Sequence, residues 1–191
     1  MFVTPAWDQA LFTWINTRHA PAADWLMLAV SEAWLAWALG GLVLALYVWR
    51  KGVRSALPLL LIPLAVGAAD FSTKHLKDAN CRARPLNTLP HTRFFEDGVW
   101  QKRPAGFSRK PGCGSSYPSA HAANTMAAAS SVMFLIPQTR PWLLALPAVT
   151  GYSRVYLGKH YPTDVLAGWV VGLAWAAFVR MLFMWWRRRR N

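Results

Sequence analysis

Acidic side chains are scarce in this chain of 191 residues, which has 8 Asp and Glu against 21 Lys and Arg. Its 2 Cys and 5 His show no tight ligand spacing of the kind that binds zinc. The sequence has no internal repeat, and no positive segment precedes a short apolar core as in a secretory signal. These absences argue against a repeat protein, a metal site and a cleaved leader. The length is that of a single domain over residues 1–191.

Charge is also sparse in long stretches of the chain, and 54% of all residues are hydrophobic. The clearest apolar runs are residues 34–49, 56–73, 121–136 and 164–186, with a weaker fifth run at residues 142–157. A membrane-spanning helix needs roughly 20 apolar residues, and several runs come close to that length. A formal net charge of +13 would indicate a nucleic-acid partner in a soluble protein. In a chain this apolar, no nucleic-acid partner is expected, and the bilayer is the predicted environment.

Basic residues between the apolar runs predict the orientation in the membrane. Arg50, Lys51 and Arg54 separate the first two runs, Arg140 follows the third, and four arginines at residues 187–190 end the last one. By the positive-inside rule, these sites face the cytoplasm. The sequence therefore predicts an all-α, polytopic transmembrane helix bundle of five to six spans in a bacterial-type cytoplasmic (inner) membrane.

In this orientation, residues 77–118 form an extracytoplasmic loop between the second and third clear spans. The motif clusters described below then lie on the side that faces the periplasm or cell exterior. The loop is itself basic, which the positive-inside rule does not favour. We attribute its cations to an anionic substrate.

Residues 1–33 form a separate N-terminal element in this scheme. Four apolar side chains recur at helical spacing among polar residues, which predicts an interfacial amphipathic helix: Trp7, Leu11, Phe12 and Ile15. Pro21 then breaks the chain. Residues 22–33 contain acidic side chains that are costly in lipid, so they either extend the first span outward or form a re-entrant piece. A sixth span is therefore left open.

Gly168 and Gly172 form a small-xxx-small pattern in the last apolar run. Such a pattern lets a second helix approach closely. We favour packing inside the bundle over dimerisation, and the sequence does not fix the oligomeric state.

The first polar cluster pairs two cations at the outer end of a span. Lys77 and Arg84 are seven residues apart, which places them on one side of a helix if the helix continues to Pro85. Arg binds phosphate oxygens bidentately, and Lys adds a point charge. The alternative is an ordinary rim of basic side chains that snorkel to the interface.

The second cluster opens a helix. Pro118 suits a first helical turn, and Ser119 can cap the helix or bind an anion through its hydroxyl. Free backbone N–H groups such as that of Ala120 form an anion site there. His121 beside this site is a catalytic candidate, and a purely structural histidine is the alternative.

The third cluster places a histidine and a carboxylate four residues apart. Asp164, one turn away, can hold the imidazole of His160 by one nitrogen and leave the other free to attack. Arg154 adds a cation for the oxygens of a phosphoryl transition state. The alternative is that Asp164 simply caps a helix.

Taken together, the clusters carry a family resemblance. They read K-x6-RP at residues 77–85, PSxH at residues 118–121 and SR-x5-H-x3-D at residues 153–164. This order and spacing resemble the type 2 phosphatidic acid phosphatase superfamily, which also contains the vanadium haloperoxidases. Those haloperoxidases usually resemble soluble chains, so the apolar character favours the membrane phosphatase branch.

The resemblance implies roles for the motif residues. It implies a phosphate pocket made by Lys77, Arg84, Ser119, Ala120 (through its backbone) and Arg154. It further implies that His160 is the nucleophile, Asp164 its orienting partner and His121 the general acid, with no metal and no cofactor. The family usually has Gly before the histidine of the second cluster, where this chain has Ala120. The methyl group leaves the backbone N–H available.

The two cysteines, Cys81 and Cys113, both lie in the predicted outer loop. An oxidising compartment permits a disulfide between them. It would close a loop of about 33 residues and stabilise the fold by roughly 3–4 kcal/mol. The alternative is two unrelated small residues.

These observations predict an integral-membrane lipid phosphatase that works through a phosphohistidine. Its partners are the bilayer and a lipid phosphate substrate. Substrates typical of the family are undecaprenyl pyrophosphate, phosphatidylglycerol phosphate, phosphatidic acid and lipid A phosphate, with a slight preference for the first by analogy with other small members. One alternative is a phosphotransferase that passes the phosphate to another lipid. An alternative of another class is a non-catalytic membrane binding or scaffold protein.

Overall fold

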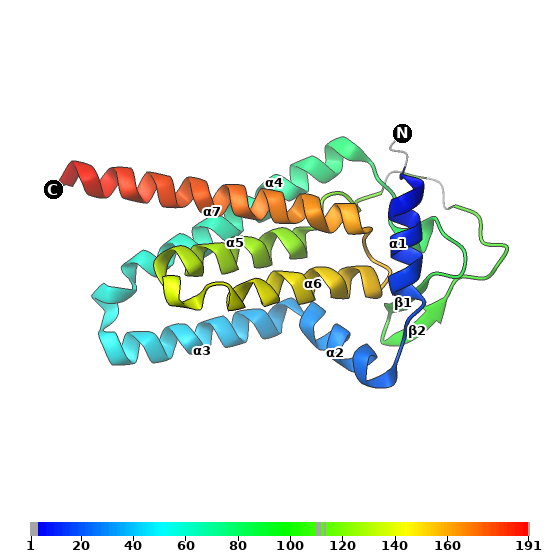
Figure 1. Ribbon diagram of the computed structural model, residues 1–191, viewed down its shortest axis with the longest axis horizontal. Coiled ribbons are helices and arrows are strands. Elements are labelled where there is room, and N and C mark those ends of the chain that lie inside the picture. The colour runs from blue at the N-terminus through cyan, green and yellow to red at the C-terminus, as the bar shows by residue number, and fades with distance from the viewer. Residues whose placement is uncertain (1–3, 110–111, 113, 191) are drawn as a thin grey trace.

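The computed structural model describes residues 4–109, 112 and 114–190, and these form seven α-helices and one β-hairpin (Figure 1). The helices are α1 (Ala6–Asn16), α2 (Pro21–Ser31), α3 (Ala33–Lys51), α4 (Leu61–Asn80), α5 (Ala120–Leu135), α6 (Ala145–Tyr156) and α7 (Pro162–Arg190). Short 3₁₀ segments occur at Val53–Leu60, Pro85–Asn87, Pro137–Thr139 and Trp142–Leu144. The fold is thus mostly helical, as predicted.

Helix α5 lies at the centre and packs against α4, α6 and α7. Its buried positions carry small side chains, including Ala122, Ala123 and Ala127, which are all fully buried. Small residues allow helix backbones to approach closely without a large side chain between them. The α4–α5–α7 contact therefore has a tight, alanine-rich core.

The small-residue pattern of α7 faces α5 inside the same chain. A Cβ atom at Gly168 would lie 2.4 Å from the carbonyl oxygen of Ser119, and one at Gly172 would lie 2.2 Å from that of Ala123. No real Cβ atom tolerates such distances, so only glycine fits at these two positions. The prediction that this pattern packs internally is confirmed.

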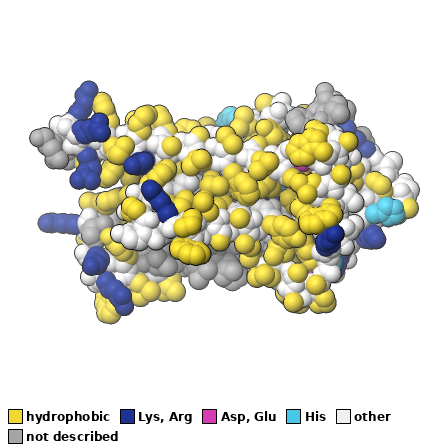
Figure 2. Space-filling view, viewed as in Figure 1, with side chains coloured by type: hydrophobic (Ala, Val, Ile, Leu, Met, Phe, Trp, Pro, Cys, Tyr) yellow, Lys and Arg dark blue, Asp and Glu magenta, His cyan; other side chains and the backbone are white. Residues whose placement is uncertain are grey.

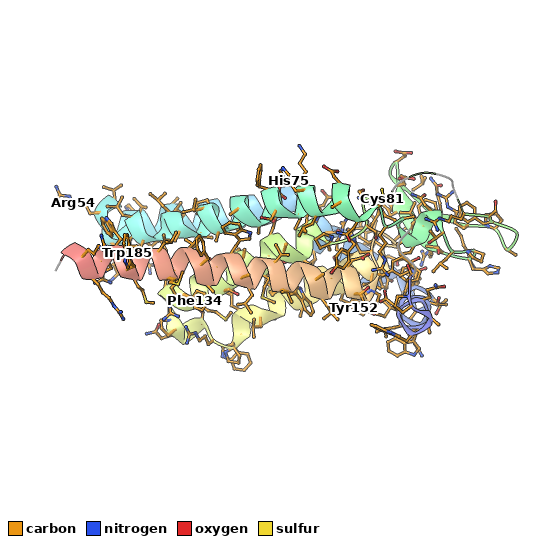
Figure 3. All side chains as sticks on the ribbon, turned by 90° about the horizontal axis from the view of Figure 1, so that it is seen from above. Arg54, His75, Cys81, Phe134, Tyr152 and Trp185 are labelled. Atoms are coloured by element: carbon orange, nitrogen blue, oxygen red, sulfur yellow. The ribbon has the colours of Figure 1, made fainter. Side chains whose placement is uncertain are left out.

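The outer surface of the bundle is apolar along its length. Two helical stretches, Ala56–Asn87 and Pro162–Arg189, are long and apolar enough to cross a membrane. Figure 2 shows hydrophobic side chains over the middle of the molecule and Lys and Arg side chains gathered at the end that carries the C-terminus. Arg54 and Trp185 lie at that end, and Cys81 lies toward the other (Figure 3). A broad apolar belt between polar ends is what a lipid-facing surface requires.

The N-terminal element consists of two helices. α1 lies crosswise over the end of the bundle opposite the C-terminus (Figure 1) and packs against α6 and α7. Its buried side carries the apolar Phe12 and Ile15 together with the polar Asp8 and Asn16, while Trp7 and Leu11 are exposed. The two polar side chains are buried because they bind other segments of the protein. Asn16, for example, donates from Nδ2 to the carbonyl oxygen of Tyr156 at 2.9 Å.

Helix α2 does not continue into the first apolar run, and its acidic side chain Asp24 is bound by other parts of the protein. The chain breaks at Glu32, whose backbone is extended, before α3 begins. Asp24 of α2 is bound by Arg93 at 2.8 Å and by the Tyr156 hydroxyl at 2.6 Å. Its charge is thus compensated inside the protein, as acidic groups near lipid require.

The long loop after α4 folds over the end of the bundle. Helix α4 ends at Asn80, and Cys81 follows in the left-handed conformation with φ +50°. Further on, β1 (Arg93–Glu96) and β2 (Val99–Lys102) form an antiparallel hairpin with Phe95 opposite Trp100. The expectation that α4 continues to Pro85 is therefore wrong, since the chain turns four residues earlier.

Candidate active site

The three motif clusters meet at the end of the bundle that is opposite the C-terminus. They come from the last turn of α4 and the loop after it, the start of α5, and the segment that joins α6 to α7. The Ser119 N–H donates to the carbonyl oxygen of Asp164 at 2.9 Å, which joins the second cluster to the third. Arg82, which lies between Lys77 and Arg84 in the chain, donates to the Asp164 carboxylate at 2.5 Å. These contacts bring the three clusters together.

A cleft of about 710 Å³ opens beside the cations of the first motif. Its lining is largely polar and includes Lys77, Arg84, Asn87, Glu96, Arg103 and Ser115. Although Lys77 and Arg84 do not share a helix, the turn at Cys81 brings both to this cleft. Arg84 is steadied by a long hydrogen bond of 3.4 Å to the Ser115 hydroxyl. The volume is typical of small-ligand sites.

His160 is buried in the turn between α6 and α7, with 2% of its surface exposed. Its Nδ1 atom lies 2.8 Å from the carbonyl oxygen of Ser116 and 3.7 Å from Oδ2 of Asp164. Because a carbonyl oxygen only accepts, Nδ1 carries the proton and Nε2 keeps its lone pair. The expected hydrogen bond from His160 to Asp164 is thus replaced by one to a backbone carbonyl. The carboxylate is close enough to act through its charge.

Other donors occupy the carboxylate of Asp164. Its Oδ1 accepts from Nη1 of Arg82 at 2.5 Å, and its Oδ2 accepts from the Ser116 hydroxyl at 2.6 Å and the Tyr161 backbone N–H at 2.8 Å. Both Asp164 and Arg82 are almost completely buried. The carboxylate is therefore fixed by groups other than the histidine, which explains why it does not reach the imidazole. Asp164 therefore does more than cap the start of α7, which was the alternative role for this residue.

Burial lowers the pKa of His160 from 6.5 to about 4, because the imidazolium is costly to desolvate. The positive charges of Arg154 and Arg84 lower this pKa further, while Asp164 opposes the shift. The imidazole of the free protein is thus neutral near pH 7. A neutral imidazole with a free Nε2 lone pair is the form that a nucleophile needs.

Arg154 contributes a buried guanidinium from the last turn of α6. Its Nη1 donates to the hydroxyl of Ser31 in α2. Its Nε is buried and has no hydrogen-bond partner among the described residues. Buried donors are almost always satisfied, so an unsatisfied guanidinium N–H in this position is suited to bind an anion.

The start of α5 is anchored to the third motif. The Ser119 hydroxyl caps the helix at 3.5 Å from the Ala122 N–H, and the Ser119 N–H donates to the carbonyl oxygen of Asp164 at 2.9 Å. Ala120 is the first residue of α5, where backbone N–H groups have no partner within the helix. His121 follows it and is partly buried.

Four residues of this region had no role assigned from the sequence: Asp8, Ser31, Arg82 and Ser116. Ser116 acts partly through its carbonyl group, which every residue type has, so no sequence signal identifies it. Arg82 has a weak signal, since it is a third cation near Lys77 and Arg84, but a basic loop offers no means of choosing between its cations.

Cys81 is disulfide-bonded. Its predicted partner, Cys113, lies outside the described residues, so the pairing of the two stays a prediction. In the part of the chain that the structure describes, no group of three or more His, Cys, Asp or Glu side chains is placed to hold a metal ion.

Comparisons with known proteins agree on one family. The family model described as the PAP2 superfamily matches residues 58–189. The chain is 46% identical over 174 residues to a lipid A 4'-phosphatase of Bacteroides thetaiotaomicron, covering 86% of this chain and 72% of that protein. It is 26% identical over 172 residues to an undecaprenyl-diphosphatase of Sulfolobus acidocaldarius, covering 88% of this chain and 74% of that protein.

A crystal structure has the same fold. It is described as the first transmembrane PAP2 type phosphatidylglycerolphosphate phosphatase from Bacillus subtilis and superposes with a TM-score of 0.66 at 20% identity, covering 93% of this chain and 84% of that one. The family match at residues 58–189 includes all three motif clusters. It leaves out helices α1, α2 and α3. The chain therefore belongs to the PAP2 superfamily.

Proposed function

We propose that this protein is an integral-membrane lipid phosphatase that passes a phosphoryl group from a lipid to His160 and then to water. The observation that carries the proposal is the buried imidazole of His160, held through Nδ1 at 2.8 Å from the Ser116 carbonyl oxygen, at the end of the bundle where Lys77 and Arg84 line a polar cleft. Cations for a phosphate, a neutral nucleophile and a second histidine are the groups that such a reaction needs.

In the first step, Nε2 of His160 attacks phosphorus and the bond from phosphorus to the lipid oxygen breaks. His121 gives its proton to that departing oxygen. The imidazole now carries a positive charge, which the fixed carboxylate of Asp164 at 3.7 Å stabilises. The proton stays on Nδ1 throughout, and Nδ1 continues to donate it in a hydrogen bond to the carbonyl oxygen of Ser116.

In the second step, His121 takes a proton from water, and the resulting hydroxide attacks phosphorus. The P–N bond breaks and phosphate leaves, with His160 neutral again. Lys77, Arg84 and Arg154, with the N–H groups at the start of α5, bind the oxygens of both transition states. Each such donor typically contributes on the order of a hundredfold or more in rate.

The membrane arrangement that we propose has five spans, with α1 and α2 resting at the outer interface. Under it, the basic C-terminal end of the bundle lies at the cytoplasmic face and the cleft opens to the periplasm or cell exterior. Exposed Trp7 and Trp14 on α1 support an interfacial position, since Trp is enriched at membrane interfaces.

The two sides of the site support a lipid substrate with a polar headgroup. The cleft has a polar lining for the phosphate and the group that bears it. An apolar groove of about 500 Å³ between α4 and α7 is lined by residues that include Phe71, Leu76, Val170 and Trp175. Leu76 directly precedes Lys77, which lines the polar cleft. Lipid tails would fit there. The 46% identity to a lipid A 4'-phosphatase makes lipid A phosphate the first substrate to test, followed by undecaprenyl pyrophosphate.

The test is a panel of detergent-solubilised lipid phosphates: lipid A phosphate, undecaprenyl pyrophosphate, phosphatidylglycerol phosphate and phosphatidic acid. Released phosphate is measured with and without chelator for the natural protein, His160→Gln and the control His91→Gln, an exposed histidine of the loop after α4. We expect chelator-resistant release that His160→Gln abolishes and His91→Gln retains. No release from any lipid, or equal release by His160→Gln, would overturn the proposal. Label on an added acceptor lipid in place of free phosphate would show a phosphotransferase.

A further inference from the structure

Arg82 lies between the two cations of the first motif but does not share their position in the cleft. Its side chain is 1% exposed and bridges two buried carboxylates, with Nη2 at 2.6 Å from Asp8 and Nη1 at 2.5 Å from Asp164. Its guanidinium also packs over the Tyr161 ring, 4.4 Å from the centroid. A planar guanidinium can serve two carboxylates at once, which an ammonium group does less well.

Asp8 closes the bridge from the other side. Its carboxylate accepts from the backbone N–H of Thr163 at 3.1 Å and from the Thr163 hydroxyl at 2.5 Å. The Thr163 hydroxyl is also 2.6 Å from Nη1 of Arg82. The ring Asp8–Arg82–Asp164–Thr163 thus joins α1, the loop after α4 and the first turn of α7.

Arg82 reaches the proposed nucleophile by two routes. Through its side chain it fixes Asp164, whose carboxylate holds the Ser116 hydroxyl at 2.6 Å. Through its backbone carbonyl it accepts from the Ser116 N–H at 2.9 Å. The carbonyl of that same Ser116 accepts the Nδ1 proton of His160 at 2.8 Å. Both anchors of the imidazole, its hydrogen-bond partner and its charge partner, therefore depend on Arg82.

We propose that Arg82 and Asp8 are positioning residues for the phosphoryl transfer that the proposed function assigns to His160. Arg82 holds the Ser116 carbonyl and the Asp164 carboxylate in the places that orient His160, and Asp8 orients Arg82. Neither side chain binds the phosphate. The N-terminal helix α1 is then part of the catalytic apparatus through Asp8, although the family match begins at residue 58.

The experiment compares Arg82→Lys, Asp8→Asn and the double variant with a matched control, Arg93→Lys. This control disturbs the ion pair between Arg93 and Asp24, which are 2.8 Å apart and lie outside the site. The measurements are kcat, KM, the rate of phosphohistidine formation and the affinity for inorganic phosphate. Phosphate binds the same cations without a bond to His160, so its binding also reports how many sites are folded.

We expect Arg82→Lys to lower kcat and the phosphohistidine rate by about a hundredfold, since a misplacement of about 1 Å has that effect. KM and the affinity for inorganic phosphate should stay within about threefold, because Lys77, Arg84 and Arg154 are untouched. Asp8→Asn should lower kcat by about tenfold relative to the natural protein. The double variant should have the same kcat as Arg82→Lys, because the effect of Asp8 passes through Arg82. Arg93→Lys should leave kcat within about twofold.

Folded Arg82→Lys and Asp8→Asn proteins with kcat within twofold of the natural protein would overturn the inference. So would losses of phosphate affinity as large as the losses of kcat, because these would indicate a structural role alone. If Arg82→Lys does not fold, Asp8→Asn carries the test, since it leaves the pair of Arg82 and Asp164 in place. A natural protein that turns over without phosphohistidine would instead contradict the proposed function.

Discussion

The imidazole of His160 is 2.8 Å from the carbonyl oxygen of Ser116 but 3.7 Å from the carboxylate of Asp164. The two partners therefore divide the work that a single carboxylate does in a histidine–aspartate pair. The carbonyl fixes which nitrogen carries the proton, and in the proposed mechanism the carboxylate supplies negative charge for the imidazolium that forms on phosphorylation. This division predicts that the charge of Asp164 can be removed, with a measurable loss of activity, while the orientation of the imidazole is largely kept.

Asp164→Asn should remove the charge and keep most of the shape. The amide still accepts from the Ser116 hydroxyl or the Tyr161 N–H, but it no longer compensates Arg82 or the imidazolium. We expect kcat to fall by about a hundredfold or more with little change in KM. Steady-state kinetics of the purified variant check this, and a kcat within threefold of the natural protein would argue against the charge role.

The pH profile should reflect the lowered pKa of His160, about 4 in the free protein. In the proposed mechanism the nucleophile is the neutral form of His160, which exists above that pKa, so the acid limb of kcat/KM that belongs to His160 should lie near pH 4. The ionisation of the substrate phosphate is measured separately and divided out. An acid limb near pH 6.5, the ordinary pKa of histidine, would mean that the imidazole is more exposed to water than it is in the structure.

Gly172→Ala should destabilise the contact between α5 and α7. The new Cβ would lie 2.2 Å from the Ala123 carbonyl oxygen and 2.9 Å from the Ala127 nitrogen, both backbone atoms that cannot move aside alone. Overpacking of this kind typically costs about 1–3 kcal/mol. Gly67→Ala in α4 is the matched control, because its Cβ would meet nothing within 4 Å. Thermal unfolding in detergent should show a lower Tm for Gly172→Ala only, and equal Tm values would contradict the close packing.

The disulfide should join Cys81 to Cys113 and support the outer loop. Mass spectrometry of unreduced protein should find the peptides of both cysteines linked. Reduction, or Cys81→Ser, should lower stability by about 3–4 kcal/mol on the loop-entropy estimate. Two free thiols in the unreduced protein would exclude the bond.

The sequence was a good guide to the helices because long apolar runs and proline breaks are local signals. It predicted less well where a chain turn depends on distant contacts. The turn at Cys81 separates Lys77 from Arg84 although their spacing fits one helix. α1 buries Asp8 and Asn16 beside the apolar Phe12 and Ile15, because the partners of Asp8 and Asn16 come from residues far along the chain.

The same distinction holds for the site. The motif residues could be found because their side chain types and short spacings are visible in the sequence. The hydrogen bond that fixes His160 could not, because its acceptor is a backbone carbonyl 44 residues away. Arg82 was hidden for a related reason: its two carboxylate partners are 74 and 82 residues distant.

The most direct test of the account is to trap the covalent intermediate. The protein is mixed with a lipid substrate labelled in the phosphoryl group, quenched in alkali, where phosphohistidine survives, and digested for mass spectrometry. The account predicts label on the peptide that contains His160, none on the peptide that contains His121, and none in His160→Gln. Turnover without label on His160, or label on another residue, would contradict it.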